Sequence, residues 1–288
     1  MRECRVRLSI SHTTTYRYAR PVRLNAHQMM LRPRGSHDLR VVAHDLRCRP
    51  AAELVWTEDV FGNLAATAVF DAAVQELVID STLTVETFAD PWPVLRIDPG
   101  AHQYPYGQTD DDVLDLAAFR DPQRGDPSVE RWARGFILSV PTDTLSLLKD
   151  LNAGVLGACA YRARDEEGTQ SAAETLRLGS GSCRDLAALF VEAVRHLGFG
   201  ARAVSGYLFD PDQAERQEDT THAWAEVFLP GAGWVPFDPT HNRMGSGGLI
   251  AVAVGRRNSQ IMPVTGSFAG EPEDVLGMDV DVRITAID

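Results

Sequence analysis

One amphipathic stretch, together with the glycines before it, constrains the fold of this chain more than any other feature. Six apolar residues recur at the spacing that gives a helix one buried face. They are Leu186, Leu189, Phe190, Ala193, Val194 and Leu197. Gly198 follows directly and provides a C-terminal stop. The sequence therefore predicts a helix that begins at Cys183, ends near Gly198 and packs into the core.

Cys183 is predicted to occupy the first turn of this helix. Ser182 is a typical N-cap residue, and Gly179 and Gly181 come before it. The free backbone N–H groups and the positive end of the helix dipole favour a thiolate at such a position. A small core residue at a helix start is the alternative interpretation, but it would not need a Gly-x-Gly approach that clears space around it. We therefore predict that Cys183 is a nucleophile.

The composition limits the class of protein. At 288 residues the chain is long for one compact core, so two domains are expected. A net charge of −12, with no basic stripe in the sequence, argues against a nucleic-acid partner. The sequence contains no run of about 18 apolar residues, so it predicts no membrane span. The N-terminus lacks the apolar segment of a signal peptide. The four cysteines fit neither a disulfide framework nor a zinc ribbon, so we expect a cytoplasmic protein.

Residues 1–90 alternate between polar and apolar side chains, which predicts an antiparallel β-sandwich domain. The expected strands are Arg5–Val22, His27–Pro33, Leu39–Cys48, Val55–Val60, Leu64–Phe70 and Glu76–Phe88. The histidines of this region, which do not have the spacing of a metal site, are His12, His27, His37 and His44. A proline-rich passage at residues 91–110 is expected to link this domain to the next.

Residues 111–288 are expected to form a second domain in which helices come first and strands follow, an α+β arrangement. Apart from the helix at Cys183, the expected helices are Val113–Phe119, Ser128–Leu138, a helix capped by Thr142 or Asp143 that runs to Leu156, and Ser171–Leu178. The expected strands are Ala201–Phe209, His222–Leu229, Trp234–Phe237 and a closing strand within Asp274–Ile287. The sequence does not reveal the partner of that closing strand.

A predicted hairpin carries candidates for a base and its orienting group. His222 opens its first strand, and Asp238 ends the second strand after the turn at Pro230–Gly233. In a hairpin the start of one strand lies near the end of its partner. A cysteine nucleophile needs a base for its proton, and the base needs a group that orients it. The sequence therefore predicts a triad of Cys183, His222 and Asp238.

At these residues the chain resembles the transglutaminase-like superfamily of papain-like cysteine enzymes. The matching stretches are Gly-Ser-Cys-Arg-Asp-Leu-Ala at 181–187, His-Ala-Trp-Ala-Glu-Val at 222–227 and Gly-Trp-Val-Pro-Phe-Asp-Pro-Thr at 233–240. The resemblance extends to Tyr161 and to segments 252–256 and 263–266, and the N-terminal strands resemble the β-domain that precedes the core in bacterial members. It implies a papain-like transglutaminase core with Cys183 as nucleophile, His222 as base and Asp238 as orienting group.

The chain departs from the family pattern at two points. Family members often read Asp-Pro-Thr-Asn, whereas here His241 stands before Asn242. Animal transglutaminases also place an oxyanion-stabilising tryptophan before the cysteine, and the corresponding residue here is Leu147. The remaining oxyanion candidates are the Cys183 backbone N–H and the Tyr161 hydroxyl, with a buried structural tyrosine as the alternative.

Trp224 and Asp185 are expected to have structural roles. Trp224 is expected to form part of the cleft wall and the core. Asp185, in the first turn of the predicted helix, is expected to hydrogen-bond locally or to serve the helix N-terminus.

The predicted chemistry is acyl transfer from an amide through a thioester on Cys183. Hydrolysis of a protein or peptide substrate is favoured because water is always available, whereas transamidation needs an amine site that nothing in the sequence specifies. No cofactor and no metal are expected, since no acidic cluster looks like a calcium loop. Two alternatives remain: a binding module that keeps the fold without activity, and a metal hydrolase that uses His222, Asp238 and His241.

Overall fold

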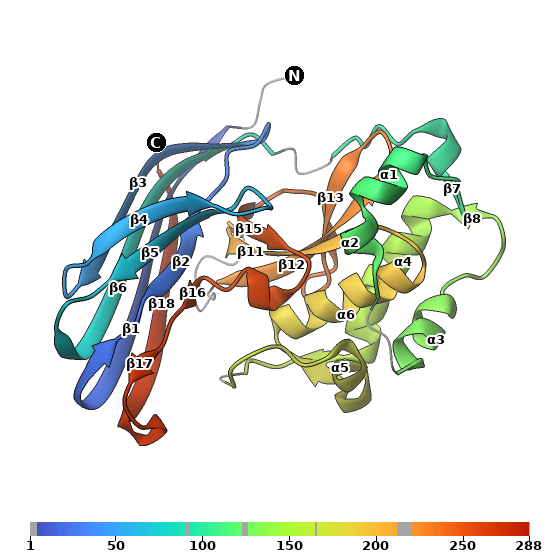
Figure 1. Ribbon diagram of the computed structural model, residues 1–288. Helices are drawn as coiled ribbons and strands as arrows, with labels where there is room; N and C mark the ends of the chain where they lie inside the picture. The colour runs from blue at the N-terminus through green and yellow to red at the C-terminus, as the bar shows by residue number, and fades with distance from the viewer. Residues whose placement is uncertain (1–4, 90–92, 123–125, 165, 212–220, 288) are drawn as a thin grey trace.

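The computed structural model describes residues 5–89, 93–122, 126–164, 166–211 and 221–287 of the 288-residue chain. Figure 1 shows a strand-rich region beside a region in which helices cover one further sheet. Cys4 and the first two residues of the expected linker, 91 and 92, lie outside the described residues.

Two antiparallel sheets make up the strand-rich region. The strands of the first are β1 (Val6–Leu24), β3 (Leu39–Arg49), β6 (Ala73–Thr87), β17 (Phe268–Ala269) and β18 (Val275–Ile287), with β6 between β1 and β3. Those of the second are β2 (His27–Arg32), β4 (Glu53–Glu58), β5 (Leu64–Val69) and β16 (Val264–Thr265), in the order β16–β2–β5–β4.

The two sheets pack face to face around one buried cluster, as alternating strands allow. Its buried members are Tyr18, Val22, Leu24, Met29, Leu31, Cys48, Ala66, Ala68, Leu77 and Ile79. This packing confirms the predicted antiparallel sandwich.

The closing strand of the chain belongs to this sandwich. β18 pairs with β1 from Arg7–Ile287 to Tyr18–Val275, and β16 and β17 pair with β2 and β1. Residues 264–287 therefore lie apart from the core to which the sequence assigns them. The reason is that an alternating pattern shows which face of a strand is buried but does not identify its neighbour.

The other region is built on a five-stranded antiparallel sheet of order β14–β13–β12–β11–β15. Its strands are β11 (Ala201–Leu208), β12 (His222–Leu229), β13 (Gly233–Asp238), β14 (Arg243–Met244) and β15 (Leu249–Gly255). The helices of this region are α1 (Asp110–Asp115), α2 (Ala117–Arg120), α3 (Ser128–Arg134), α4 (Thr144–Ala158), α5 (Ala172–Leu178) and α6 (Cys183–His196). None of these described helices is long and apolar enough to cross a membrane.

Helix α6 is the centre of this region. All six of the predicted apolar residues are buried in a cluster with α3, α4 and one face of β12 and β13. Gly198, with φ of 88°, follows the end of the helix as predicted. Two expected helices differ in extent: residues 113–119 are divided between α1 and α2, and α3 ends at Arg134 because Gly135 caps it.

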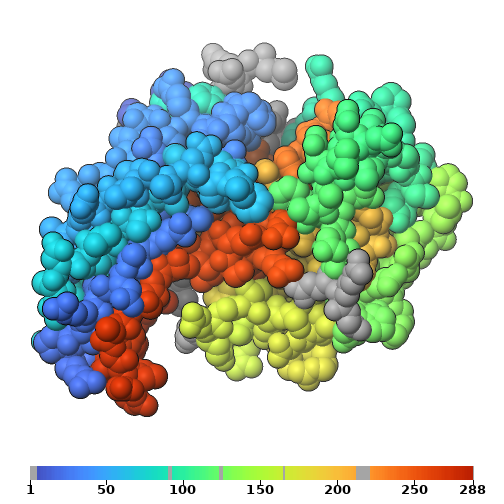
Figure 2. Space-filling view, viewed as in Figure 1, coloured from blue at the N-terminus to red at the C-terminus, as the bar shows by residue number. Residues whose placement is uncertain are grey.

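Short elements complete the helical region: the strand pairs β7 (Gln103–Tyr104) with β8 (Thr142–Asp143) and β9 (Ala160–Tyr161) with β10 (Ser180–Gly181), and the 3-10 turns η1 (Pro99–Ala101) and η2 (Asn258–Gln260). A third 3-10 turn, η3 (Pro272–Asp274), belongs to the sandwich, where Arg20 of β1 pairs with Asp274. The face of the sheet away from α6 packs on the sandwich. The buried residues at this junction are Leu8, Ile10, Leu39, Leu83, Val85, Tyr207, Ile250, Val252 and Val282. His12 Nδ1 lies 3.0 Å from the Tyr207 hydroxyl across it. Figure 2 shows the C-terminal segment in red between the blue sandwich strands and the yellow helices.

Candidate active site

Cys183 is the first residue of α6, and the contacts around it hold this helix start in place. Ser182 caps the helix, and its N–H and Oγ–H both donate to Asp185 Oδ2, at 2.9 and 2.8 Å. A Cβ on Gly181 would lie 2.7 Å from the Asp185 Cβ, so only glycine fits this approach. The Gly-x-Gly spacing therefore reflects a real steric need, and Cys183 remains partly exposed.

Asp185 ties this helix start to the preceding loop. Arg164 Nη1 donates to both carboxylate oxygens at 2.9 and 2.8 Å, and the Gln170 N–H donates to Oδ1 at 2.8 Å. Burial raises the pKa of Asp185, but Arg164 and these hydrogen bonds outweigh it and hold the pKa below its usual range. The local role expected for Asp185 agrees with these contacts, whereas the part played by Arg164 was not evident from the sequence.

The hairpin of β12 and β13 brings His222 and Asp238 together. Its ladder pairs Ala225 with Phe237 and Leu229 with Gly233. Continued toward the open end, this register makes His222 and Asp238 diagonal neighbours on one face. His222 Nε2 lies 2.9 Å from Asp238 Oδ2, so the structure brings these two predicted residues into hydrogen-bond contact.

His222 also contacts Cys183. Because Nε2 binds Asp238, Nδ1 is the ring nitrogen left for the side-chain hydrogen bond between His222 and Cys183. Burial lowers the pKa of His222, but the Asp238 charge and the hydrogen bonds to Asp238 and Cys183 raise it to about 10. Both contacts favour the protonated imidazole, which joins the thiol to the carboxylate.

Asp238 has two further partners. The Thr240 N–H donates to Oδ1 at 2.9 Å, and His241 Nδ1 lies 2.8 Å from Oδ2, the oxygen that also binds His222. Burial raises the pKa of Asp238, but His222 and His241 together hold it well below its usual range. The hydrogen bond between His241 and Asp238 was not predicted from the sequence, although the metal-hydrolase alternative groups His241 with Asp238 and His222.

Asn152 of α4 holds the chain that follows the aspartate. Its Nδ2 donates to the Asp238 carbonyl at 3.4 Å and to Asn242 Oδ1 at 3.2 Å. The side chain is buried beside the apolar residues Leu151 and Val155. Asn152 is a polar residue on the otherwise apolar face of the predicted helix, and a buried amide needs hydrogen-bond partners. This pattern could have revealed its role from the sequence.

Trp224 and Tyr161, the two further residues singled out from the sequence, have different surroundings. The indole of Trp224 is buried and stacks on His222, with ring centroids 5.9 Å apart. Tyr161 pairs with Gly181 in the β9–β10 ladder and is 53% exposed, so the buried structural reading of this tyrosine does not hold. Its ladder partner Gly181 lies two residues before Cys183, which places Tyr161 near the start of α6.

Three of these side chains are close enough together to hold one metal ion. One nitrogen each from His222 and His241 and one oxygen from Asp238 all lie within 4.8 Å of one another. The residues of the metal-hydrolase alternative are therefore adjacent, and two of them also belong to the predicted triad.

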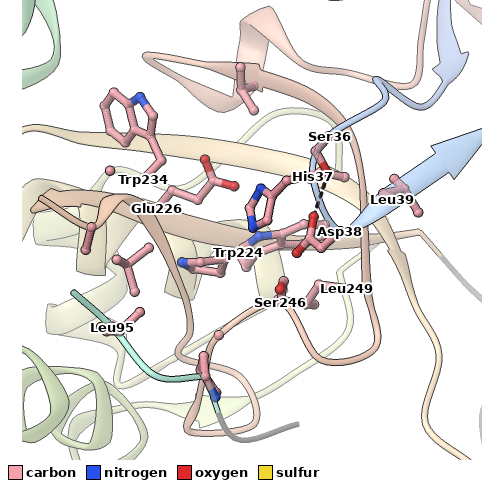
Figure 3. A pocket seen from close by; sticks show the side chains of 18 of the residues that line it. Ser36, His37, Asp38, Leu39, Leu95, Trp224, Glu226, Trp234, Ser246 and Leu249 are labelled. Atoms are coloured by element: carbon pink, nitrogen blue, oxygen red, sulfur yellow. Dashed lines mark hydrogen bonds between the residues drawn. The ribbon is translucent and has the colours of Figure 1, made fainter. Parts of the chain in front are cut away.

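A separate cavity of about 640 Å³ lies on the opposite side of Trp224 from the helices. Figure 3 shows Trp224, Glu226 and Trp234 of the core lining it together with His37 and Asp38 of the sandwich. Arg202 pairs with Glu226 at 2.6 Å inside it. Neither Cys183 nor His222 lines this cavity, so the cavity is separate from the candidate site around Cys183.

Comparison with protein families gives two matches. Residues 8–86 match the bacterial transglutaminase-like N-terminal region, and residues 130–239 match the transglutaminase-like superfamily. Cys183, His222 and Asp238 all fall within the second match. These matches confirm the family resemblance of the sequence.

Similar chains occur in mycobacteria. An uncharacterized protein of Mycobacterium tuberculosis is 28% identical over 294 residues, which cover 96% of this chain and 92% of the relative. One from Mycobacterium leprae is 25% identical over 302 residues, covering 98% and 99%. The crystal structure of a candidate cysteine protease from Cytophaga hutchinsonii has a TM-score of 0.74 at 19% identity, covering 99% of this chain and 91% of that one. This last similarity shows that the two share a fold and confirms the predicted fold class.

Proposed function

The chain belongs to the transglutaminase-like superfamily, and from that premise we propose that it is a cysteine-dependent enzyme that hydrolyses amide bonds of a protein or peptide. The observation that carries the proposal is the placement of His222, which contacts Cys183 through one ring nitrogen and Asp238 through the other. A nucleophile, a base and an orienting group in this order are what thioester chemistry requires.

In the first step the Cys183 thiolate attacks the amide carbonyl carbon, and the carbonyl electron pair moves onto oxygen. The N–H groups at the start of α6 lack helical acceptors and are the nearest fixed donors for this oxyanion, with Tyr161 as a second candidate. The intermediate collapses, the carbon–nitrogen bond breaks, and His222 gives its Nδ1 proton to the leaving amine. A thioester and a neutral imidazole remain.

In the second step neutral His222 takes a proton from water at Nδ1, and the resulting hydroxide attacks the thioester. The carbon–sulfur bond breaks, the acid leaves, and the thiolate–imidazolium pair is restored. Asp238 keeps its bond to Nε2 throughout, so it fixes the ring and stabilises its charged form. An amine in place of water would give transamidation by the same route.

We favour hydrolysis because no described feature provides a separate amine site beside Cys183. The free thiols of Cys48, Cys159 and Cys183 fit a reducing compartment, so a cytoplasmic location remains part of the proposal.

The test is a mass-spectrometric screen of peptides and glutamine-containing proteins, with and without an added amine. The wild type should cleave or deamidate a substrate, and Cys183→Ala should not while keeping its circular dichroism spectrum. Products that appear only with an amine would identify a transamidase. A Cys183→Ala variant with full activity would refute the proposal, and a folded wild type inactive on the whole panel would favour a binding module.

A further inference from the structure

We propose that His222, Asp238 and His241 form a reversible Zn²⁺ site whose occupancy stops turnover at Cys183. The inhibition rests on the function proposed above, whereas metal binding itself does not. Zinc would then regulate the enzyme rather than serve as its catalyst.

The geometry of the three side chains suits one small cation. His222 Nε2 and His241 Nδ1 lie 2.9 and 2.8 Å from the same oxygen, Asp238 Oδ2, and all three atoms lie within 4.8 Å of one another. Zinc bonds of about 2.0–2.1 Å in a tetrahedron separate neighbouring ligand atoms by about 3.3 Å. The two nitrogen–oxygen distances therefore have to grow by only about 0.4–0.5 Å to match this spacing.

The surroundings support a metal in this place. The backbone of Thr240 donates to Asp238 Oδ1, which orients the carboxylate and leaves Oδ2 for an ion. The side chain of His241 is 28% exposed, against 8% for His222 and 0% for Asp238. His241 therefore provides the side from which an ion can enter from solvent.

The donor set selects the metal. Mg²⁺ and Ca²⁺ prefer oxygen ligands, whereas imidazole nitrogens favour Zn²⁺ and its neighbours in the transition series. Two histidines and one carboxylate with a fourth position left for water are an ordinary zinc arrangement. The sequence predicts no metal because His241 follows Asp238 across a proline and shows no metal motif; the fold brings the three ligands together.

Occupancy would stop the proton transfers of His222. On binding, Zn²⁺ takes the electron pair of Nε2, and the proton held there leaves to solvent. The ring keeps its Nδ1 proton and its contact with Cys183, so the thiolate can still attack a reactive ester. In the second step, however, a ring with metal on Nε2 and a proton on Nδ1 has no free electron pair to accept a proton from water. The thioester should therefore form and persist.

The first experiment measures binding directly on the full-length chain. After dialysis against a chelator and then buffer, ZnSO₄ is titrated by calorimetry and the bound zinc is counted by mass spectrometry. We expect one Zn²⁺ per chain in the wild type and in Cys183→Ala. His241→Ala should weaken the affinity at least tenfold, whereas His102→Ala, which removes an exposed imidazole elsewhere, should not.

The second experiment follows p-nitrophenyl ester hydrolysis. With stoichiometric Zn²⁺ the initial burst of nitrophenol should remain, the steady-state rate should fall at least tenfold, and a chelator should restore it. His241→Ala should need at least tenfold more zinc for the same inhibition.

The outcomes separate this proposal from the function above. An absence of zinc binding, or binding lost in Cys183→Ala but kept in His241→Ala, would overturn the proposed site. An activity that is lost on chelation would overturn inhibition in favour of a metal hydrolase. Tight zinc binding that depends on His241, in a chain with no esterase or amidase activity, would support the site and count against the proposed enzyme. A melting temperature of His241→Ala within about 3 °C of the wild type controls for unfolding; if it is lower, His241→Asn takes its place.

Discussion

Arg164→Met removes the guanidinium that neutralises Asp185 beneath the start of α6. Asp185 has no exposed side-chain surface and Arg164 is 15% exposed. Removing one partner of a buried ion pair costs about 3–5 kcal/mol because the other charge is left unpaired. Ser182 and Gln170 still donate to the carboxylate, so we expect the lower end, about 3 kcal/mol. At about 2–4 °C per kcal/mol, the melting temperature should fall by about 6–12 °C.

The loss of stability in Arg164→Met should depend on pH in a definite direction. In the wild type the pKa of Asp185 is lowered, so its stabilising contribution is present above the unfolded-state value of about 3.9 and is lost as the pH falls through the folded-state value. Without Arg164, fewer interactions oppose the effect of burial on Asp185, so the pKa of Asp185 in the folded state rises. Protonation then relieves the unpaired charge, so the gap between wild type and variant should narrow as the pH falls from 7 toward 4.

Urea unfolding at pH 7 and pH 4.5 measures both effects. Arg134→Met serves as the matched control, because Arg134 and Glu130 form an exposed pair at 2.9 Å whose loss should cost about 0.5 kcal/mol or less. A second Asp185→Asn substitution should recover part of the loss at pH 7. If Arg164→Met costs no more than Arg134→Met, or if its cost is the same at both pH values, the reasoning about this buried pair is wrong.

Two further predictions concern the triad. Asp238→Asn should fold but turn over more slowly. The loss should be smaller than the roughly 10⁴-fold seen in a serine triad, because the Cys183–His222 contact does not depend on Asp238 alone. Steady-state ester hydrolysis measures this loss, and an unchanged rate would exclude Asp238 as the orienting group. At pH 7, substoichiometric iodoacetamide should label Cys183 ahead of Cys48 and Cys159. Both of these other thiols are buried, and burial raises their pKa, to about 11 for Cys48. Peptide mapping measures the labelling of each cysteine, and equal labelling would mean that Cys183 is not activated.

The sequence predicted the elements whose signal is local. The apolar spacing of α6 and the cap at Ser182 follow directly from helix geometry, and the structure has them at Cys183–His196. The contact between His222 and Asp238 followed from hairpin geometry, in which the turn fixes the register and thereby places these two residues diagonally on one face.

What the sequence did not show depends on contacts between distant segments. Arg164 meets Asp185 only because β9 and β10 pair, and Asn152 meets the chain after Asp238 only because α4 packs beside β13. The partner of β18 lies at the opposite end of the chain. Patterns within one segment report burial and caps, but they do not identify which other segment lies against it.

The most direct test of the central claim is to find the acyl group on the enzyme. Wild type and Cys183→Ala are mixed with an excess of a p-nitrophenyl ester of an N-acylated amino acid, quenched in acid within the burst, digested and analysed by mass spectrometry. The account predicts one equivalent of released nitrophenol and the acyl mass on the peptide that contains Cys183, with neither in Cys183→Ala. An acyl mass on another residue, or the same burst from Cys183→Ala, would contradict it.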